Sequence, residues 1–175
     1  MTYRADIKIL ATEPRVQELL NNYYQKAAPS TAGSSGLDLL NPRLYAVRAE
    51  PAYRVFDTGV EISESEGRTN IKFDVAIAMY CNETNERVSY CLIPRSSFSK
   101  LGLAMGNSIG LIDSDYNGEL QANIYTLIHR TFVIQEGTRL FQIVAPSLGK
   151  ITQVRVVDSL PDTIRGTGGF GSTGA

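Results

Sequence analysis

The stretch from Gly106 to Glu119 reads GNSIGLIDSDYNGE, and its pattern predicts a β-hairpin. The apolar residues at 109–112 indicate a short strand, the Asp- and Asn-rich letters after them indicate a turn, and a second strand is expected to begin at Gly118. Asp113 ends the apolar run, so we expect its carboxylate to be partly desolvated, as a general base needs to be. Tyr116 would place a flat ring at the same edge. A solvated turn is the plainer explanation of the same letters.

Short strands separated by turns are predicted along most of the chain. Their approximate ranges are 5–10, 44–49, 53–62, 70–80, 87–93, 109–112, 118–128, 131–135, 140–145 and 151–157. Many short strands within one domain favour a sandwich, a jelly roll or a barrel. The sequence therefore predicts an all-β domain over residues 1–158, followed by a polar, Gly-rich segment over residues 159–175 that leaves the body of the domain.

One helix is predicted, over residues 13–27. Apolar and aromatic side chains recur there at helical spacing and form one face. They are Val16, Leu19, Leu20, Tyr23, Tyr24 and Ala27. Pro14 suits a first turn, and Thr12 is the candidate N-cap. Core packing is the favoured role of this face, and contact with a subunit or partner is the alternative.

The composition limits the functions that the chain can have. The 175 residues carry 17 Lys and Arg against 18 Asp and Glu, so no basic field favours DNA or RNA. No apolar run reaches membrane-spanning length, and the N-terminus has no apolar signal core. Two cysteines and one histidine form no zinc pattern. We expect an intracellular, cytoplasmic protein that binds neither nucleic acid nor membranes.

Two further segments carry polar groups suited to a phosphorylated ligand. Residues 34–39 form a small-residue loop that brings the Asp38 carboxylate to the start of a strand, although an Asx turn explains the same residues. Arg95 is followed by Ser96 and Ser97. A guanidinium followed by hydroxyls makes a phosphate grip, and the capped start of a helix is the alternative.

The last two polar segments lie near the C-terminus. Arg139 and Gln142 are polar exceptions in a strand that we expect to be buried, so they need partners, which other strands would also provide. Residues 165–175 read RGTGGFGSTGA. A cation, an aromatic ring, hydroxyls and unhindered amides suit the wrapping of a nucleotide. A frayed terminus is the alternative for this stretch.

Taken together and in this order, the segments resemble the five motifs of the homotrimeric dUTPase family. The matching stretches are Ser35–Leu39, Pro94–Ser97, Gly110–Gly118, Gly137–Gln142 and Arg165–Ser172. The resemblance covers residues 34–173, and the third and fifth motifs are the most specific. Ser35 and Leu37 depart from the usual first motif, whose Gly and Asp are kept. The segments 13–27 and 40–93 are longer than is usual in the family.

This resemblance implies a fold, an assembly and a reaction. The subunit would be a jelly-roll-like β-barrel of the dUTPase type with one extra N-terminal helix. Three subunits would form a homotrimer and share their active sites. The enzyme would be a dUTP diphosphatase that hydrolyses dUTP to dUMP and pyrophosphate with Mg²⁺, by in-line attack of water on the α-phosphorus. Residues 159–175 would close over the nucleotide as a flexible lid.

The resemblance also implies a role for each matching residue. Asp113 would be the general base that activates the attacking water. Tyr116 would pack on the deoxyribose and crowd out a ribose 2′-hydroxyl. Asn107 would read uracil together with the strand backbone at Gly110 and Ile112.

The remaining roles concern the phosphates, the metal and the lid. Arg95 and Gln142 would act in catalysis by holding the phosphates and the attacking water, and Asp38 would hold Mg²⁺ through water. The other substrate-binding residues would be Ser96, Ser97, Arg165, Phe170, Gly171, Ser172 and Thr173. Among these, Phe170 would stack on uracil.

Two alternatives to this function stay open. The dCTP deaminase branch of the same fold has similar motifs, but it places a catalytic glutamate where this chain has Asn123. A non-catalytic dUTPase-like module that regulates a partner would use residues 13–27 or 40–93 as its contact surface. The intact Asp113 and the intact tail favour an enzyme.

Overall fold

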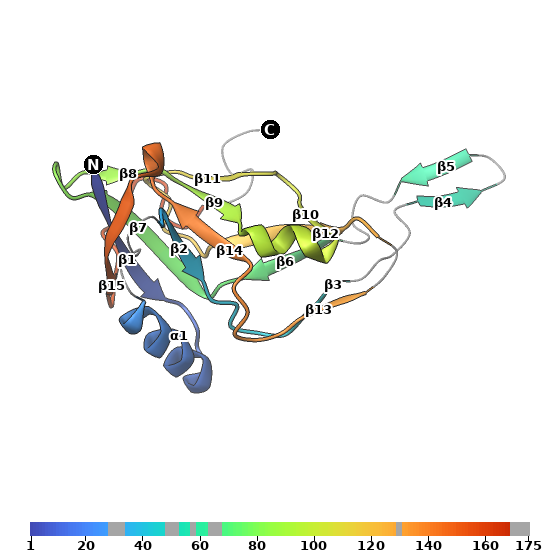
Figure 1. Cartoon of the computed structure of the whole chain (residues 1–175), viewed down its shortest axis with the longest axis horizontal. Helices are drawn as coiled ribbons and strands as arrows, with labels where there is room; N and C mark the ends of the chain where they lie inside the picture. Colours follow the sequence, from blue (N-terminus) through green and yellow to red (C-terminus); the bar gives the residue numbers. More distant parts are fainter. Residues whose placement is uncertain (28–33, 48–52, 57–58, 63–67, 129–130, 169–175) are drawn as a thin grey trace.

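The computed structural model describes residues 1–27, 34–47, 53–56, 59–62, 68–128 and 131–168. Its strands are β1 (Thr2–Ile9), β2 (Gly36–Leu39), β3 (Tyr45–Val47), β4 (Tyr53–Phe56), β5 (Gly59–Ile62), β6 (Arg68–Lys72), β7 (Val75–Cys81), β8 (Arg87–Val88), β9 (Tyr90–Pro94), β10 (Leu103–Met105), β11 (Gly110–Ile112), β12 (Gln121–Thr126), β13 (Phe132–Ile134), β14 (Phe141–Val144) and β15 (Lys150–Val156). Its helical elements are α1 (Pro14–Lys26) and the 3₁₀ turns η1 (Ser96–Leu101) and η2 (Pro146–Leu148). Figure 1 shows their arrangement. In the described residues, the prediction of a β-protein with a helix near its N-terminus is confirmed.

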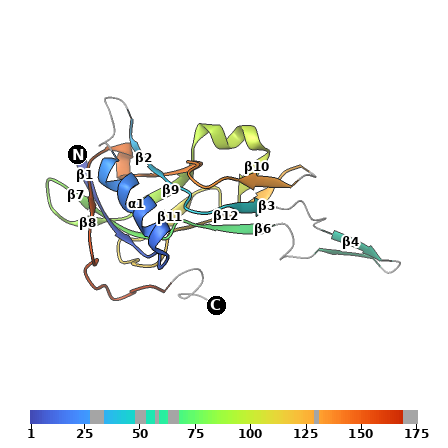
Figure 2. The same ribbon diagram turned by 90° about the horizontal axis from the view of Figure 1, so that it is seen from below.

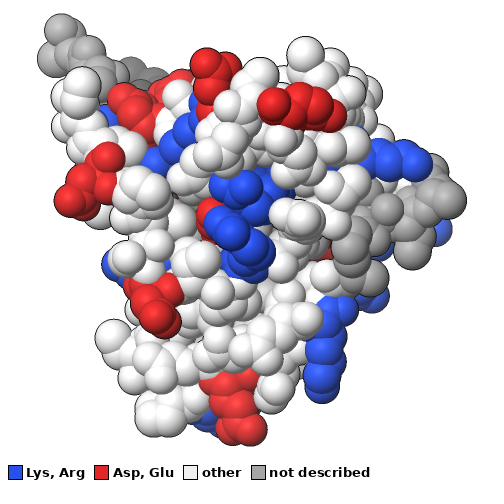
Figure 3. Space-filling model, turned by 90° about the vertical axis from the view of Figure 1, so that its left-hand side faces the viewer, with Lys and Arg blue, Asp and Glu red and all other residues white. Residues whose placement is uncertain are grey.

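The first sheet has the strand order β15-β1-β7-β8. β1 is parallel to β15 and antiparallel to β7. Tyr3, Ala5 and Ile7 of β1 are buried in the core, as alternation along a half-buried strand requires. Asp6 forms ion pairs with Arg4 and with Arg155 of β15. Figure 3 shows this side of the molecule, on which acidic and basic side chains are interspersed.

The helix α1 packs against β1 and β15 (Figure 1). It buries Val16, Leu20 and Tyr24, so the helix predicted over residues 13–27 is confirmed to within a residue at each end. The predicted cap is wrong. Glu13, not Thr12, is the N-cap, and its side chain makes no capping hydrogen bond. Proline in the first turn lacks the N–H that a cap would bind, which reduces the need for one.

The sheet with the order β11-β9-β14-β2 carries four of the residues predicted for the site, which are Gly110, Ile112, Gln142 and Asp38. Gly110 of β11 pairs with Leu92 of β9, and Ile93 of β9 pairs with Gln142 of β14. Gln142 pairs in turn with Asp38 of β2. This register fixes where each of these side chains leaves the sheet.

The predicted hairpin after residue 109 is wrong. β11 pairs with β9, whereas β12 pairs with β10 and β6 in a different sheet. The chain changes sheet in the turn between them, within which Tyr116 donates its hydroxyl to the carbonyl of Glu119 at 2.9 Å. Its ring stands where a Cβ on Gly118 would be, so only glycine fits there.

Two other predicted strands are each interrupted. The range 53–62 consists of the paired strands β4 and β5, which project from the body of the molecule (Figure 2). The range 70–80 is divided between β6 and β7, and Asp74 between them has a φ of 53°, which is a left-handed conformation that strands do not contain. The short strand β10 had no counterpart in the predictions.

One hydrophobic cluster fills the interior, and the rings of Phe73 and Phe141 meet edge to face in it at 5.8 Å. After β15, Leu160 packs on Ala76 and Ala78. Residues 169–175 lie outside the described part of the chain, so the boundary at residue 158 stays a prediction. No helix in the described residues has the length and apolarity that a membrane span needs.

Candidate active site

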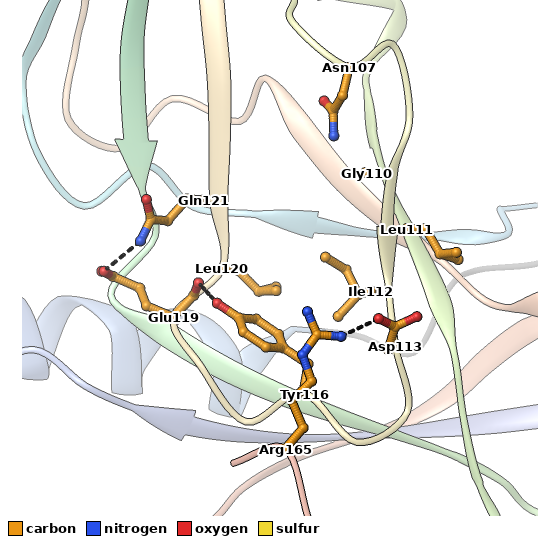
Figure 4. Close-up of a pocket in the computed structure, with 10 residues that line it drawn as sticks. All are labelled: Asn107, Gly110, Leu111, Ile112, Asp113, Tyr116, Glu119, Leu120, Gln121 and Arg165. Atoms are coloured by element: carbon orange, nitrogen blue, oxygen red, sulfur yellow. Dashed lines mark hydrogen bonds and ion pairs between the residues drawn. The ribbon is translucent and has the colours of Figure 1, made fainter. Parts of the chain in front are cut away.

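A pocket of about 130 Å³ lies between β11, the turn that follows it and the start of β12 (Figure 4). Its lining residues are Asn107, Gly110, Leu111, Ile112, Asp113, Tyr116, Glu119, Leu120, Gln121 and Arg165. All but the last come from one stretch of chain. Arg165 comes from the C-terminal arm, by which we mean residues 157–168. Six residues predicted for the site therefore meet here: Asn107, Gly110, Ile112, Asp113, Tyr116 and Arg165.

β11 is an edge strand within the described residues, since it pairs there with β9 alone. A Cβ on Gly110 would lie 3.3 Å from both Leu92 Cβ and Met105 Cε, so glycine lets the strand approach its neighbours closely. The free edge of such a strand presents backbone N–H and C=O groups. Asn107 lies at the opposite end of the pocket from Asp113, with its amide directed into the pocket (Figure 4). Together these groups offer the donors and acceptors that a planar base requires.

Asp113 forms an ion pair with Arg165 of the same chain. The Arg165 guanidinium also lies 5.5 Å from the centre of the Tyr116 ring and 3.9 Å from a carboxylate oxygen of Asp115. The side chain of Asp113 is 48% exposed, so the desolvation that we expected is not present in the isolated chain. The pocket thus holds a carboxylate and a movable cation at one end.

Tyr116 is held in place by its neighbours in the turn. Partial burial raises the pKa of its hydroxyl, which therefore stays protonated and donates to the Glu119 carbonyl. Burial also raises the pKa of the Glu119 carboxyl, with a hydrogen bond to Asp74 as the next cause. The sequence did not single out Glu119, because its partner Asp74 is remote in the chain.

Arg87 and Asn117 join the turn to the C-terminal arm. Arg87 Nη2 donates to the Tyr116 carbonyl at 3.0 Å and to Asn117 Oδ1 at 2.7 Å. Asn117 then donates its side-chain amide to the carbonyl of Pro161 and its backbone N–H to that of Gly166, both at 2.8 Å. These residues were missed in the sequence, since each acts through a partner more than 25 positions away.

A second group of predicted residues, the Asp38–Arg95 cluster, consists of Asp38, Arg95, Arg139 and Gln142. Arg95 Nε lies 2.9 Å from Asp38 Oδ1, and Arg139 Nη1 lies 3.5 Å from Asp38 Oδ2. Arg95 Nη1 also donates to the Arg139 carbonyl at 2.9 Å. The side chain of Gln142 occupies the space beside Gly36, where any Cβ would collide with it. The cluster thus places two guanidinium groups around one carboxylate, and Gln142 lies on the strand that pairs with β2.

Ser96 and Ser97 begin the 3₁₀ turn η1 next to this cluster, and both are exposed. The helix-start explanation is confirmed in part. The N-cap is Arg95 rather than a serine, and it makes no side-chain capping bond. The hydroxyls of Ser96 and Ser97 do not cap the turn, so both can bind a ligand.

The Asp113 end of the pocket and the Asp38–Arg95 cluster lie at opposite ends of β9. The backbone N–H of Ser114 donates to Ser89 Oγ at 3.1 Å, just before β9 begins. Arg95 directly follows the end of β9. The extended chain from residue 89 to residue 95 spans about 20 Å at roughly 3.3 Å per residue. One chain therefore does not bring Asp113 to Asp38, Arg95 and Gln142.

Two points remain: the predicted residues of the tail, and the position at which the deaminase branch carries its glutamate. Phe170, Gly171, Ser172 and Thr173 lie outside the described residues. Asn123, at the position of the deaminase glutamate, lies on β12 and donates its side-chain amide to Asn70 Oδ1 at 2.6 Å. An amide in a hydrogen bond with another amide offers no carboxylate for deamination chemistry.

Comparison with known proteins shows similarity to one well-defined family. A family model described as dUTPase matches residues 22–174. A deoxyuridine 5′-triphosphate nucleotidohydrolase of Acinetobacter baumannii is 34% identical over 146 residues, which are 83% of this chain and 85% of that protein. The enzyme of the same name from Laribacter hongkongensis is 35% identical over 151 residues, or 86% of this chain and 89% of that protein.

A solved structure resembles the fold. The dUTPase of Staphylococcus bacteriophage 80alpha matches with a TM-score of 0.51 and 17% sequence identity, covering 80% of this chain and 87% of its own. Together with the strand content, this likeness confirms the predicted all-β, jelly-roll-like fold of the dUTPase type.

Proposed function

Because this chain belongs to the dUTPase family, we propose that it is a dUTP diphosphatase that cleaves dUTP to dUMP and pyrophosphate. The observation that carries the proposal is the pocket beside β11. An edge strand with free backbone groups leads there directly to Asp113, and the Tyr116 ring stands across from it. These are the parts needed to hold a nucleoside and to activate water beside it.

Asp113 is the general base of the proposed reaction. It takes a proton from a water molecule as the water oxygen forms a bond to the α-phosphorus of dUTP. The bond from that phosphorus to the bridging oxygen breaks on the opposite side, and pyrophosphate leaves with the bonding electrons. For Asp113 to accept the proton, Arg165 must leave its ion pair with it. The triphosphate carries more charge than a single carboxylate, so it attracts this guanidinium away.

The pocket selects the base and the sugar. The free edge of β11 at Gly110 and Ile112 and the amide of Asn107 would hydrogen-bond the uracil edge. The ring of Tyr116 is fixed by its own hydroxyl and by the lack of a side chain at Gly118. A fixed ring against C2′ of the sugar leaves no space for a ribose hydroxyl. Discrimination between dUTP and UTP then follows from shape.

The Asp38–Arg95 cluster would receive the phosphates. Arg95 and Gln142, with the hydroxyls of Ser96 and Ser97, supply hydrogen-bond donors to phosphate oxygens and to the attacking water. Both carboxylate oxygens of Asp38 already face guanidinium groups, so this residue fits a water-mediated contact with Mg²⁺ better than direct ligation. Mg²⁺ keeps several waters and takes oxygens from phosphates, and when bound it would neutralise charge on the triphosphate.

We infer that the enzyme is a homotrimer with active sites shared between subunits. The separation of about 20 Å along β9 means that Asp113 of one subunit needs the Asp38–Arg95 cluster of another. The tail, including Phe170, Gly171, Ser172 and Thr173, would close over the bound nucleotide as a lid, with Phe170 on uracil. An enzyme of the free nucleotide pool would work in the cytoplasm.

A product assay tests the proposal. The protein is incubated with dUTP, dCTP, dTTP or UTP in the presence of Mg²⁺, and the products are identified by chromatography. We expect dUMP and pyrophosphate from dUTP, with little turnover of the other three. Ammonia release from dCTP would instead establish the deaminase alternative. The absence of any product would favour a binding module without catalysis.

A further inference from the structure

Two side chains of α1 make hydrogen bonds to the segments that carry Asp38 and Arg139 of the Asp38–Arg95 cluster. The hydroxyl of Tyr23 donates to the carbonyl oxygen of Asp38 at 3.2 Å. At the other end of the helix, both terminal nitrogens of Arg15 donate to the carboxylate of Glu136, at 2.9 and 2.5 Å. Glu136 lies in the turn that leads directly to Arg139. The helix therefore contacts the cluster itself through Tyr23 and the turn before Arg139 through Arg15.

Tyr23 lies between two members of the cluster. Its hydroxyl donates to the Asp38 carbonyl. The Arg139 guanidinium, which pairs with the Asp38 carboxylate at 3.5 Å, lies close enough to lower the pKa of this hydroxyl. Burial, followed by the nearby charge of Asp38, raises the pKa of this hydroxyl. It consequently remains protonated throughout the neutral range and keeps donating to the Asp38 carbonyl.

Packing alone does not require a hydroxyl at this position. The buried face of α1 is made by Val16, Leu20 and Tyr24, whereas Tyr23 is only partly buried and meets Tyr24 edge to face at 4.9 Å. A phenylalanine at position 23 would make the same ring contact. The hydroxyl is the part of Tyr23 that reaches the cluster.

We propose that Tyr23 is a positioning residue, through which α1 holds the Asp38 backbone and the Arg139 guanidinium in the arrangement that receives the triphosphate. The inference rests on the proposed function, because that function assigns the phosphates to this cluster. It gives α1 a role beyond the core packing of its buried face. The exposed pair of Arg15 and Glu136 adds a weaker second anchor, as exposed ion pairs do.

The variant Tyr23→Phe tests the proposal, with Tyr45→Phe as its control. The Tyr45 hydroxyl also bonds to backbone, since it donates to the Lys72 carbonyl and accepts from the Lys72 N–H. Tyr45 belongs to neither the pocket nor the cluster. We expect Tyr23→Phe to lower kcat/KM for dUTP about three- to tenfold, the range for one hydrogen bond. Tyr45→Phe should keep the wild-type kcat/KM. Its thermal midpoint should shift by about as much as that of Tyr23→Phe, because each variant loses hydrogen bonds of one tyrosine hydroxyl.

Inhibition constants locate the effect. Pyrophosphate probes the phosphate subsite alone, and deoxyuridine probes the pocket beside β11. We expect Tyr23→Phe to weaken inhibition by pyrophosphate about three- to tenfold and to leave inhibition by deoxyuridine unchanged. Equal weakening of both inhibitors, or of neither, would overturn the proposal. If the wild-type protein does not hydrolyse dUTP, the proposed function fails instead, so the two failures are distinguishable.

A double-variant comparison separates positioning from general loosening. If Tyr23 acts through Arg139, then Tyr23→Phe should cause little further loss of pyrophosphate binding in a protein that already carries Arg139→Lys, because coupled residues are not additive. Full additivity of the two losses would contradict the proposal.

Discussion

In the isolated chain, Asp113 forms an ion pair with Arg165, and this pair opposes the role of Asp113 as a general base. The Arg165 guanidinium occupies a carboxylate oxygen of Asp113, so a water molecule cannot donate to that oxygen while the ion pair lasts. The oxygen becomes accessible when Arg165 leaves it, which we expect as Arg165 turns to the phosphates of the substrate. The same cation can thus hold the site inactive before binding and stabilise charge after binding.

Replacing Asp113 by asparagine should abolish turnover while keeping the fold. Asparagine has the same shape but cannot accept the proton, and loss of a general base typically costs roughly a hundred- to ten-thousand-fold in rate. Steady-state hydrolysis of dUTP measures the loss, and circular dichroism checks the fold. Asp115→Asn is the matched control, since Asp115 is equally exposed but lies 3.9 Å from Arg165. Near-wild-type hydrolysis by Asp113→Asn would remove this residue from the mechanism.

Replacing Tyr116 by alanine should weaken discrimination against UTP more than it weakens the fold. The ring stands where a 2′-hydroxyl would lie, so its removal opens space for ribose. The ratio of kcat/KM for dUTP to that for UTP reports the change. Tyr116→Phe is the control, because it keeps the ring and loses only the hydrogen bond to the Glu119 carbonyl. Selectivity that stays the same in Tyr116→Ala would refute the steric argument.

At the scale of elements, local pattern and long-range pairing differ in how well they can be predicted. The helix α1 was predicted to within a residue because its face repeats within thirteen residues. The hairpin after β11 was predicted wrongly, because the partners of β11 and β12 are set by packing and not by the turn between them. The site residues themselves were visible as motifs. Their partners Arg87 and Tyr23 were not, since neither lies in a matching motif. Asn117 lies in the third motif, but nothing in that motif indicates its contact with the C-terminal arm.

The first part of the C-terminal arm is hydrogen-bonded to the turn that follows β11. We therefore expect the catalytic contribution of the C-terminus to come from Arg165 and the residues after it. Asn117 binds Pro161 and Gly166, and Thr163 donates its hydroxyl to the Asp115 carbonyl at 2.5 Å. A chain that ends after Ile164 keeps two of these three anchors and loses Arg165 together with the tail. We expect it to fold with nearly the wild-type thermal midpoint, because the tail adds little to the core, and to hydrolyse dUTP much more slowly.

A second truncation, after Gly168, separates the roles of the arm and the tail. It keeps Arg165 and removes Phe170, Ser172 and Thr173. If the tail closes over the nucleotide, this chain should also be slow, because closure excludes water and fixes the reacting groups. Wild-type rates in the chain that ends after Gly168 would contradict the lid. Wild-type rates in both truncated chains would contradict any role for the C-terminus in catalysis.

At the scale of the whole molecule, β9 separates the two halves of the site. Asp113 lies beyond one end of the strand and Arg95 beyond the other, and a rigid sheet has no hinge that would bring them together. Cyclic assembly solves this problem, since a heterologous interface brings different surfaces of two identical subunits face to face. An active monomer in light scattering would therefore contradict the shared site directly.

Mixed trimers provide the sharpest test of this arrangement. Asp113→Asn and Arg95→Ala should each be nearly inactive alone, because every site then lacks one group. When the two variants are unfolded together and refolded as random mixtures, some sites combine the intact Asp113 of one chain with the intact Arg95 of its neighbour. About one quarter of the sites are then complete, so activity should return to about one quarter of the wild-type value. The control mixes Arg95→Ala with Gln142→Ala, whose lesions lie in the same cluster, and no site regains both groups. No recovery in the test mixture would mean that each site is built within a single chain. Recovery in the control would mean that Arg95 and Gln142 reach each site from different chains, which would contradict the arrangement proposed here.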